Sequence, residues 1–313
     1  MARPIPVLLG PTAVGKTAIG IALAARIGGA APVGAEILSA DSRAFFVGLD
    51  VVTDKPSEAE RRGIPHHLID IVPPCGTYDA MAFRRDVARL IPEIRGRDRV
   101  PILVGGGTLY LGAILHGIFD GPAKDDRLRT EMAERPVDEL HARLAAVDPS
   151  AAGAIHPNDR LRISRALEVY EITGKPISHW QAEAKPLSVE TFLVGFRRER
   201  GDHRAAIAAR VRRMIDGGLI DEVRWLRGAG LDPSCQAYRT IGVPEVARHL
   251  DGEISLDEMV EEIVHRTWGL VRRQSAWFRR EKDVCWWNVT GRTAGAIADE
   301  IAAAWRRISG DER

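Results

Sequence analysis

The chain has 313 residues, of which 45% are hydrophobic and 28% are charged, and this length allows one large α/β domain with an insertion, or two domains. Its 44 Lys and Arg residues are balanced by 43 Asp and Glu, so the net charge of +1 excludes a chain that is basic throughout and restricts any nucleic-acid contact to a local surface. Cys75, Cys235 and Cys285 lie far apart without metal-ligand spacing, which predicts a reduced cytoplasmic protein without structural zinc, and no apolar run has the length of a signal or membrane segment.

A glycine-rich loop is the first motif in the chain. It follows an apolar run over residues 5–9 and opens into a helical pattern over 16–27, with Gly28-Gly29 as the predicted helix end. In such a loop, backbone N–H groups surround an anion and the helix N-terminus adds a partial positive charge. We therefore predict a phosphate-binding loop, in which Lys16 adds a full charge and Thr17 a hydroxyl for Mg²⁺. The loop consists of Gly10, Pro11, Thr12, Ala13, Val14, Gly15, Lys16 and Thr17.

Further apolar runs predict the other strands of a parallel sheet. Ligands bind beyond the carboxyl ends of the strands in such sheets, so Asp41 should lie on the same edge as the phosphate loop, although Asp also commonly caps turns. Asp70 is a candidate carboxylate for Mg²⁺, and the cluster Gly105-Gly106-Gly107 would allow close backbone approach to a ligand. The predicted strands cover residues 36–42, 66–72, 99–104, 191–196 and 283–289.

Helical patterns fill most of the remaining chain. After Gly121 the sequence becomes polar and rich in Ala and Arg without strand signals, which predicts an inserted helical subdomain. Asp159 should cap a helix that ends at Gly174. That helix carries Arg160, Arg162 and Arg165, and its predicted buried residues are Leu161, Ile163, Leu167 and Val169. Other helices are predicted over 78–94, 109–115, 203–215, from about 219, from the capping box Ser255–Glu258 past Trp268, and over 293–308.

The stretch 272–280 interleaves arginines with aromatic residues. Most basic helix faces are simply solvated, but aromatic side chains beside arginines are typical of nucleic-acid surfaces. The stretch by itself leaves both interpretations open.

Taken together, these motifs resemble the tRNA dimethylallyltransferases, also called isopentenylpyrophosphate:tRNA transferases. The matching stretches are GPTAVGKT at 10, ILSADS ending at Ser42, DKP at 54–56, PHHLIDIV at 65, FRRD at 83, the VGGG and LY region at 104, HPNDRLRISRALEVYEITGKP at 156, RTIG at 239 and RRQSAWFRR at 272. The resemblance implies an α/β fold with a P-loop NTPase-like parallel sheet flanked by helices. Residues 1–121 and 160–313 would form the catalytic core with the C-terminal helices, and residues 122–159 a helical insertion that contacts tRNA.

The resemblance also implies a reaction, in which a dimethylallyl group moves from dimethylallyl diphosphate to N6 of the adenosine 3′ to the anticodon, with release of pyrophosphate. The phosphate loop would bind the diphosphate together with Mg²⁺ at Thr17. Arg210 would neutralise charge on the leaving group, and Asp41 would act as the general base. We expect a monomer that binds tRNA and no membrane. The residues implied to bind tRNA are Asp41, Ser42, Arg43, Ala44, Leu161, Arg162, Ile163, Ser164, Arg165, Arg239, Thr240, Ile241, Gly242, Arg272 and Arg273.

Thr108 is a further candidate catalytic residue, although it stands one place later than the threonine of the family pattern. In an extended segment this shift would turn the hydroxyl away from the site. A positive φ at Gly107 would turn it back. We predict that Thr108 faces the site.

Three other functions stay open from the sequence. They are a small-molecule P-loop kinase, prenyl transfer to free AMP or ADP, and a tRNA-binding protein without catalysis. The large insertion and the basic aromatic stretch favour tRNA over a free nucleotide. The presence of Lys16, Asp41 and Arg210 together favours catalysis.

Overall fold

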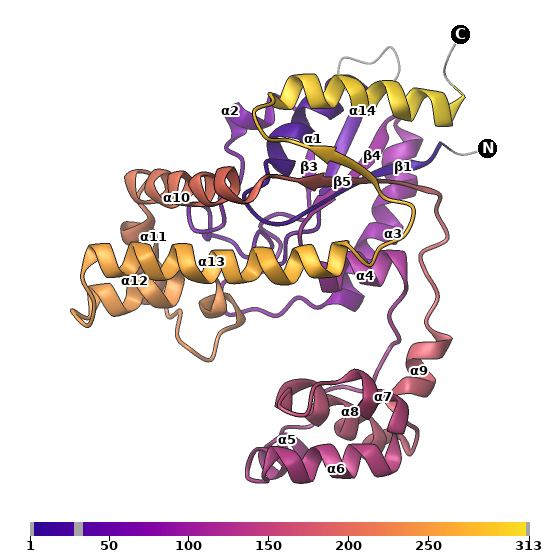
Figure 1. Ribbon diagram of the computed structural model, residues 1–313, viewed down its shortest axis with the longest axis vertical. Helices are drawn as coiled ribbons and strands as arrows, with labels where there is room; N and C mark the ends of the chain where they lie inside the picture. Colours follow the sequence, from indigo (N-terminus) through magenta and orange to yellow (C-terminus); the bar gives the residue numbers. More distant parts are fainter. Residues whose placement is uncertain (1–2, 28–33, 311–313) are drawn as a thin grey trace. The chain divides into compact units, whose positions relative to one another are not determined.

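A six-stranded sheet carries the phosphate loop at its centre (Figure 1). The computed structural model describes residues 3–27 and 34–310. In this part of the chain, neighbouring strands pair in parallel in the order β3-β2-β4-β1-β5-β6, so the phosphate loop leaves the carboxyl end of an inner strand, β1. The predicted α/β fold with a parallel sheet is confirmed. The strands are β1 (Ile5–Leu9), β2 (Ala35–Ser39), β3 (His66–His67), β4 (Val100–Gly105), β5 (Thr191–Arg197) and β6 (Cys285–Asn288).

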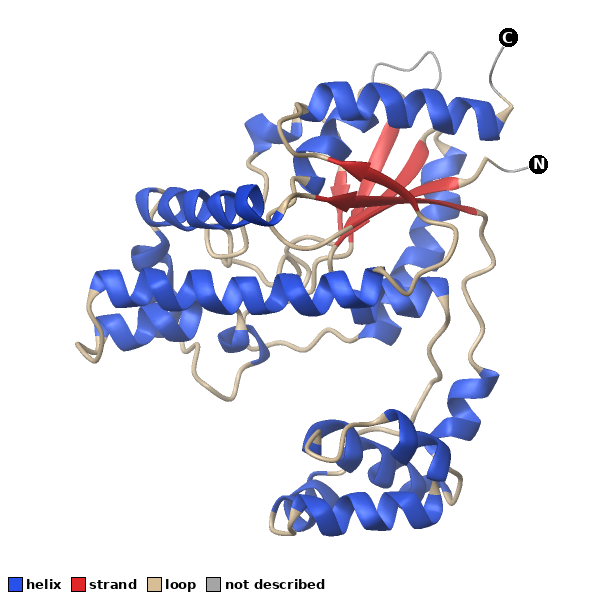
Figure 2. Cartoon of the chain, viewed as in Figure 1, coloured by secondary structure: helices blue, strands red, loops and turns tan. Residues whose placement is uncertain are grey.

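Helices α1 (Lys16–Ala24) and α14 (Ala294–Ser309) pack together over the sheet (Figure 2). Leu23 of α1 and Trp305 of α14 are buried in one apolar cluster with strand residues. Trp305 Nε1 also donates to the carbonyl of Pro4 at 2.8 Å, so the last helix is bonded to the residue directly before β1. Other helices that accompany the sheet are α2 (Glu58–Arg61), α3 (Ala80–Gly96) and α4 (Thr108–Leu115).

A second group of helices lies beside the sheet and has an apolar cluster of its own. Phe46, Leu49 and Val52, from the segment after β2, are buried in this cluster together with residues of the helices. The capping box at Ser255 begins the longest of these helices, as predicted. The group consists of α10 (Arg200–Asp216), α11 (Leu219–Gly228), the 3₁₀ helix η1 (Gln236–Arg239), α12 (Val243–Leu250) and α13 (Leu256–Phe278).

The chain divides into two compact units. The sheet unit comprises Met1–Leu111 with Ser188–Arg313, and the helical unit comprises Gly112–Leu187. The helical unit extends beyond the predicted insertion of 122–159 at both ends, because Leu167 of α8 is buried in the same apolar cluster as Leu144 of α6, and Phe119 packs against that cluster. Its helices are α5 (Asp126–Ala133), α6 (Val137–Val147), α7 (Pro149–Ala154), α8 (Arg160–Thr173) and α9 (Ile177–Glu183).

Helix α8 has the predicted start and stop but a different buried face. The side chain of Asp159 accepts from the N–H of Arg162, and Gly174 ends the helix with a left-handed φ of 69°. Ile163 is buried as predicted, whereas Leu161 is 73% exposed, so its predicted burial is wrong. Position 161 lies two residues from 163, and residues at that spacing point to different sides of a helix.

The predicted strand over 66–72 is wrong beyond its first two residues. Strand β3 ends at His67, because Leu68 (φ 62°) and Asp70 (φ 56°) have left-handed backbone that an extended strand does not allow. Asp70 Oδ1 accepts from Lys55 Nζ at 2.5 Å, which makes it an ion-pair partner of a lysine. Helix α1 is also shorter than predicted, and Gly28-Gly29 lies outside the described residues.

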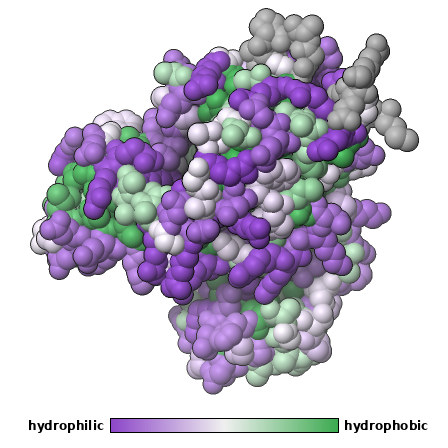
Figure 3. Space-filling model, turned by 45° about the horizontal axis from the view of Figure 1, so that its top comes forward, coloured by the Kyte–Doolittle hydropathy of each residue, from purple (hydrophilic) through white to green (hydrophobic). Residues whose placement is uncertain are grey.

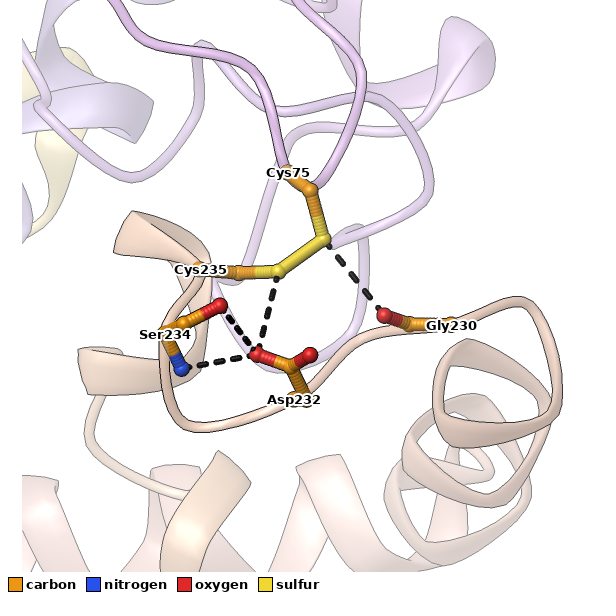
Figure 4. Close-up of a disulfide and its surroundings, with 5 residues drawn as sticks. All are labelled: Cys75, Gly230, Asp232, Ser234 and Cys235. Carbon is orange, nitrogen blue, oxygen red and sulfur yellow. Dashed lines mark hydrogen bonds between the residues drawn. A yellow bond between two sulfur atoms is a disulfide. The ribbon is translucent and has the colours of Figure 1, made fainter.

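A disulfide joins Cys75 to Cys235, so the prediction that these two cysteines are reduced is wrong (Figure 4). The two residues are 160 positions apart in sequence, and their Cα atoms lie 4.7 Å apart in the fold. Cys235 directly precedes η1, and the turn before it is held by Ser234, whose N–H donates to Asp232 Oδ1 at 2.7 Å. Cys285 is free and exposed. The disulfide therefore links the loop after β3 to the segment that leads into η1.

Within the described residues, no helix is both long enough and apolar enough to cross a membrane. The face of the molecule drawn in Figure 3 is largely hydrophilic, with smaller apolar areas between the charged side chains. Large exposed apolar side chains include Leu109 and Trp225, which are 63% and 60% exposed.

Candidate active site

The phosphate loop turns back on itself between β1 and α1. Gly15, at the N-cap of α1, has a left-handed φ of 100°, which glycine adopts without steric cost. Lys16 Nζ donates to the carbonyl of Pro11 at 2.8 Å, so its side chain lies along the loop. Burial lowers the pKa of Lys16 to about 8, although the charge of Asp41 opposes this effect. The loop therefore carries a desolvated cation that a bound anion would stabilise.

Thr12, at the middle of this loop, is held by two helices. Its N–H donates to Gln274 Oε1 on α13, and its carbonyl accepts from His203 Nε2 on α10, both at 2.8 Å. Its hydroxyl accepts from Arg210 Nη1, also at 2.8 Å. Burial lowers the pKa of His203, which favours the neutral ring that donates through Nε2. The backbone of the loop is thus oriented by residues that are far away in sequence.

Arg210 reaches the phosphate loop from α10, as predicted, and its side chain is only 18% exposed. Its Nη2 donates to the carbonyl of Thr53 at 3.1 Å, and its Nε lies 3.3 Å from Asp54 Oδ2. The segment that presents these two residues is held by Glu222 of α11, whose carboxylate accepts from the three backbone N–H groups of residues 50–52 at 2.8, 2.6 and 2.9 Å. The orientation of Arg210 thus depends on a carboxylate outside the site.

Asp41 follows the carboxyl end of β2 and lies on the predicted edge of the sheet. Its Oδ1 accepts from the N–H of Arg43 at 2.9 Å, and the carboxylate stays exposed. The Arg43 side chain donates to the carbonyl of Gln236 in η1 at 2.9 Å. Burial lowers the pKa of Arg43, and the nearby Asp41 charge counteracts this shift. Asp41 therefore both caps its own turn and presents a free carboxylate oxygen to the site.

The glycine cluster after β4 packs closely against the protein itself. A Cβ atom on Gly105 would lie 2.4 Å from the carbonyl oxygen of Ala40, and one on Gly106 would lie 2.9 Å from Gln274 Nε2. At Gly105 the neighbour is backbone, so no side chain fits there, and at Gly106 a Cβ atom would displace the amide of Gln274. We find that the glycines are needed for the approach of β2 and α13, whereas the sequence suggested only the approach of a ligand.

Thr108 borders the same cleft as Asp41 and Thr12. The prediction that a positive φ at Gly107 turns Thr108 towards the site is wrong, because the φ angle of Gly107 is not positive. Thr108 is instead the first residue of α4, so a helical turn sets its direction. Its role in catalysis stays a prediction.

Two clefts of the sheet unit meet at the carboxyl edge of the sheet. The loop cleft, of about 940 Å³, is bordered by the phosphate-loop residues Gly15, Lys16 and Thr17. The α13 cleft, of about 830 Å³, is bordered by residues 269–270 and 272–274 of that helix. The residues that border both clefts are Thr12, Asp41, Thr53 and Arg210.

The α13 cleft brings together most of the predicted tRNA-binding residues of the sheet unit. They come from the turn after β2, from η1 and the segment that follows it, and from α13. Several carry positive charge, so this cleft offers a local basic surface of the kind to which the net charge restricts nucleic-acid contact. The residues concerned are Asp41, Ser42, Arg43, Arg239, Thr240, Ile241, Arg272 and Arg273. Ala44, by contrast, is buried and borders the loop cleft, and Gly242 is the N-cap of α12.

The other predicted tRNA-binding residues lie on α8 of the helical unit. Leu161 and Arg162 are exposed there. Ile163 is completely buried in the apolar cluster of that unit, so its side chain has no surface to offer RNA. Arg165 is paired with Glu168 at 2.6 Å and also donates to the carbonyl of Pro122. The prediction of RNA contact therefore stays for the exposed residues Leu161 and Arg162.

Gln274, His203 and Glu222 take part in the site, and sequence reasoning missed them. Gln274 lies in the basic aromatic stretch, in which only the arginines were predicted to bind RNA. Its position three residues after Val271 and four before Phe278, both buried, places it on the inward face of α13. A polar residue on a buried helix face was the available signal. The sequence around His203 and Glu222 has no comparable feature that would predict their contacts with the site.

Comparisons with known proteins show the family of this chain. The sequence model of the IPP transferase family matches residues 44–281. The tRNA dimethylallyltransferase of Geobacillus kaustophilus is 42% identical over 99% of this chain and 98% of that protein. The crystal structure of the full-length tRNA isopentenylpyrophosphate transferase from Bacillus halodurans is 33% identical, covers 99% of both chains and superposes with a TM-score of 0.71. A eukaryotic dimethylallyltransferase acting on tRNA, only 24% identical, shares the fold with a TM-score of 0.79 over 98% of this chain and 78% of its own. The resemblance found in the sequence is confirmed, and the chain belongs to the IPP transferase family.

Proposed function

We propose that this protein is a tRNA dimethylallyltransferase, which moves a dimethylallyl group from dimethylallyl diphosphate to N6 of the adenosine 3′ to the anticodon. The observation that carries the proposal is the meeting of the loop cleft and the α13 cleft at Asp41 and Arg210. A group transfer needs donor and acceptor on two sides of one point, and these two residue types suit a proton acceptor and a leaving-group stabiliser. The names of the relatives support tRNA as the acceptor.

The donor diphosphate would bind in the loop cleft. Lys16 and the N-terminus of α1 supply positive charge to an anion there. During transfer the bond from the prenyl C1 to the diphosphate oxygen breaks, and pyrophosphate takes the electron pair. Arg210, already directed at Thr12 of the loop, would stabilise the added charge on pyrophosphate.

The acceptor adenine would enter the α13 cleft. Its N6 must leave the stack of the anticodon loop to reach the Asp41 carboxylate inside the cleft, as in other enzymes that modify a base. The new bond joins N6 to the prenyl C1, and the proton leaves N6 for the Asp41 carboxylate. Thr108 borders the cleft where its hydroxyl would bond the adenine or a diphosphate oxygen. The arginines of α13 would bind the RNA backbone.

The residues of the loop cleft fit a magnesium ion. Thr17 and Ser39 both border the cleft and offer hydroxyl oxygens. Among the described residues no group of three His, Cys, Asp or Glu side chains could hold a metal, which suits an ion held mainly by substrate phosphates and water. Thr17 would hold the ion, and when bound it would neutralise part of the diphosphate charge. We also propose that the protein is a monomer and acts in the cytoplasm, as the sequence led us to expect.

The test uses purified protein with unmodified tRNA and dimethylallyl diphosphate. We expect mass spectrometry of the digested tRNA to find one dimethylallyl group on the adenosine 3′ to the anticodon, with one pyrophosphate released per group. Parallel reactions with AMP and with ATP test the alternatives. Prenylated AMP without prenylated tRNA, or consumption of ATP, would refute the proposal.

A further inference from the structure

Gln274 is a buried side chain that joins two edges of the site. Its Oε1 accepts from the N–H of Thr12 at 2.8 Å, and its Nε2 donates to the carbonyl of Gly106 at 2.7 Å. Only 8% of the residue is exposed. The two partners also fix the orientation of the amide, because a flipped amide would set donor against donor and acceptor against acceptor. One side chain thus joins the phosphate loop to the carboxyl end of β4.

On α13, the residue that packs in the apolar core differs from the residues that line the cleft. Val271, one turn before Gln274, is buried in the apolar cluster formed by the helices α10 to α13 of the sheet unit and does not border the α13 cleft. Arg272, Arg273 and Gln274 do border that cleft. Val271 therefore attaches the helix to the core, while Gln274 belongs to the site.

We propose that Gln274 is a positioning residue for the diphosphate and acts through the backbone of Thr12. The hydroxyl of Thr12 is in turn the contact of Arg210, so a shift of Thr12 would move both the loop and the partner of that arginine. Glutamine is suited to this place because it donates and accepts at once. Glutamate retains only the acceptor, and methionine has the same length with neither bond. The identity of the donor rests on the proposed function, whereas the bridge itself does not.

The test compares Gln274→Glu and Gln274→Met with wild type. Calorimetric titration with pyrophosphate measures the phosphate loop directly, and steady-state kinetics separate the KM values of the two substrates. We expect both variants to weaken pyrophosphate binding by roughly ten- to a hundredfold. Methionine leaves both buried partners unpaired, whereas glutamate keeps the bond to Thr12 but places a carboxylate against the carbonyl of Gly106. The KM for dimethylallyl diphosphate should rise in parallel, while the KM for tRNA stays near wild type. Val271→Ala is the matched control and should lower the melting temperature without changing pyrophosphate affinity.

Two results would overturn the proposal. One is wild-type pyrophosphate affinity in Gln274→Met. Loss of the two hydrogen bonds would then have no effect on binding, and any defect of Gln274→Glu would be due to its added charge. The other is loss of folded protein in both variants, which would assign Gln274 to the fold. If wild type binds pyrophosphate but transfers no prenyl group to tRNA, the proposed function fails, and the pyrophosphate titrations still test the bridge.

Discussion

Glu168 in the helical unit and Lys16 in the sheet unit are both desolvated charged side chains, but their charges are balanced differently. In the helical unit, the completely buried carboxylate of Glu168 accepts from Arg129 and Arg165 at 2.8 and 2.6 Å. Burial alone would raise the pKa of Glu168, yet these bonds lower it to about 2. In the sheet unit, Lys16 donates to the carbonyl of Pro11, and burial lowers its pKa to about 8.

This difference separates a stabilising cluster from a binding site. The charge of Glu168 is matched by arginines of its own unit, so it stabilises the fold of that unit. The charged form of Lys16 is destabilised in the free protein, and a bound anion would restore that free energy. Substitutions in the two units should therefore affect different measurements.

Lys16→Ala should have the largest effect, with transfer falling below detection. The fold should be retained, because Lys16 extends along a loop and not into an apolar cluster. Transfer assays and pyrophosphate titration measure the loss, and circular dichroism measures the fold. Lys175→Ala, an exposed lysine of the helical unit, is the control. Unchanged pyrophosphate affinity in Lys16→Ala would contradict our assignment of the loop.

Asp41→Asn should reduce the rate of transfer by about 10²- to 10⁴-fold, the usual contribution of a positioned base. The amide keeps the shape and still accepts from the N–H of Arg43 but cannot take the proton from N6. Affinity for tRNA should fall less than the rate. Single-turnover kinetics make the measurement, with Asp125→Asn at the cap of α5 as the control. Equal single-turnover rates would mean that another group accepts the proton.

Glu168→Gln should lower the free energy of unfolding by about 3 kcal/mol while kcat stays near wild type. This is the lower end for a broken buried ion pair, because Arg129 and Arg165 are 35% and 31% exposed. The folded pKa of Glu168 lies below the ordinary value of 4.5, so its stabilisation is complete above pH 4.5 and is lost as the pH falls towards 2. The difference between wild type and variant should therefore shrink as the pH falls from 4.5 towards 2, as denaturant unfolding at each pH would measure. A pH-independent difference would argue against the charged pairing.

Replacing Arg272 and Arg273 together by alanine should have the smallest effect. Each phosphate contact contributes about 0.7–0.9 to the slope of log affinity against log salt, so the slope for tRNA should decrease by roughly 1.5. Pyrophosphate affinity should stay the same. The control is the paired replacement of Arg306 and Arg307, which removes the same charge from the last turn of α14. Equal slopes for the two double variants would show that the arginines of α13 are only solvated.

Local patterns predicted the parts of the fold whose causes are local. Asp159 caps α8, and the capping box at Ser255 begins α13, because each side chain bonds N–H groups within three residues. The glycine loop and the edge position of Asp41 followed in the same way. The contact of Arg210 with the loop joins residues 198 positions apart, and only the resemblance implied it. The strand over 66–72 failed because a run of apolar residues does not report the left-handed turns at Leu68 and Asp70.

The sequence by itself determined the sheet class, the phosphate loop and the family, since these depend on short motifs whose spacing is set by one strand or one helical turn. The tertiary structure alone decided that Cys75 bonds Cys235, 160 residues away, and that Gln274 orients Thr12, 262 residues away. It also decided that Glu222 supports the segment behind Arg210. The buried position of Gln274 has a local signal, but the local pattern does not identify the partner of any of these side chains. Which distant group a side chain meets depends on how the whole chain packs.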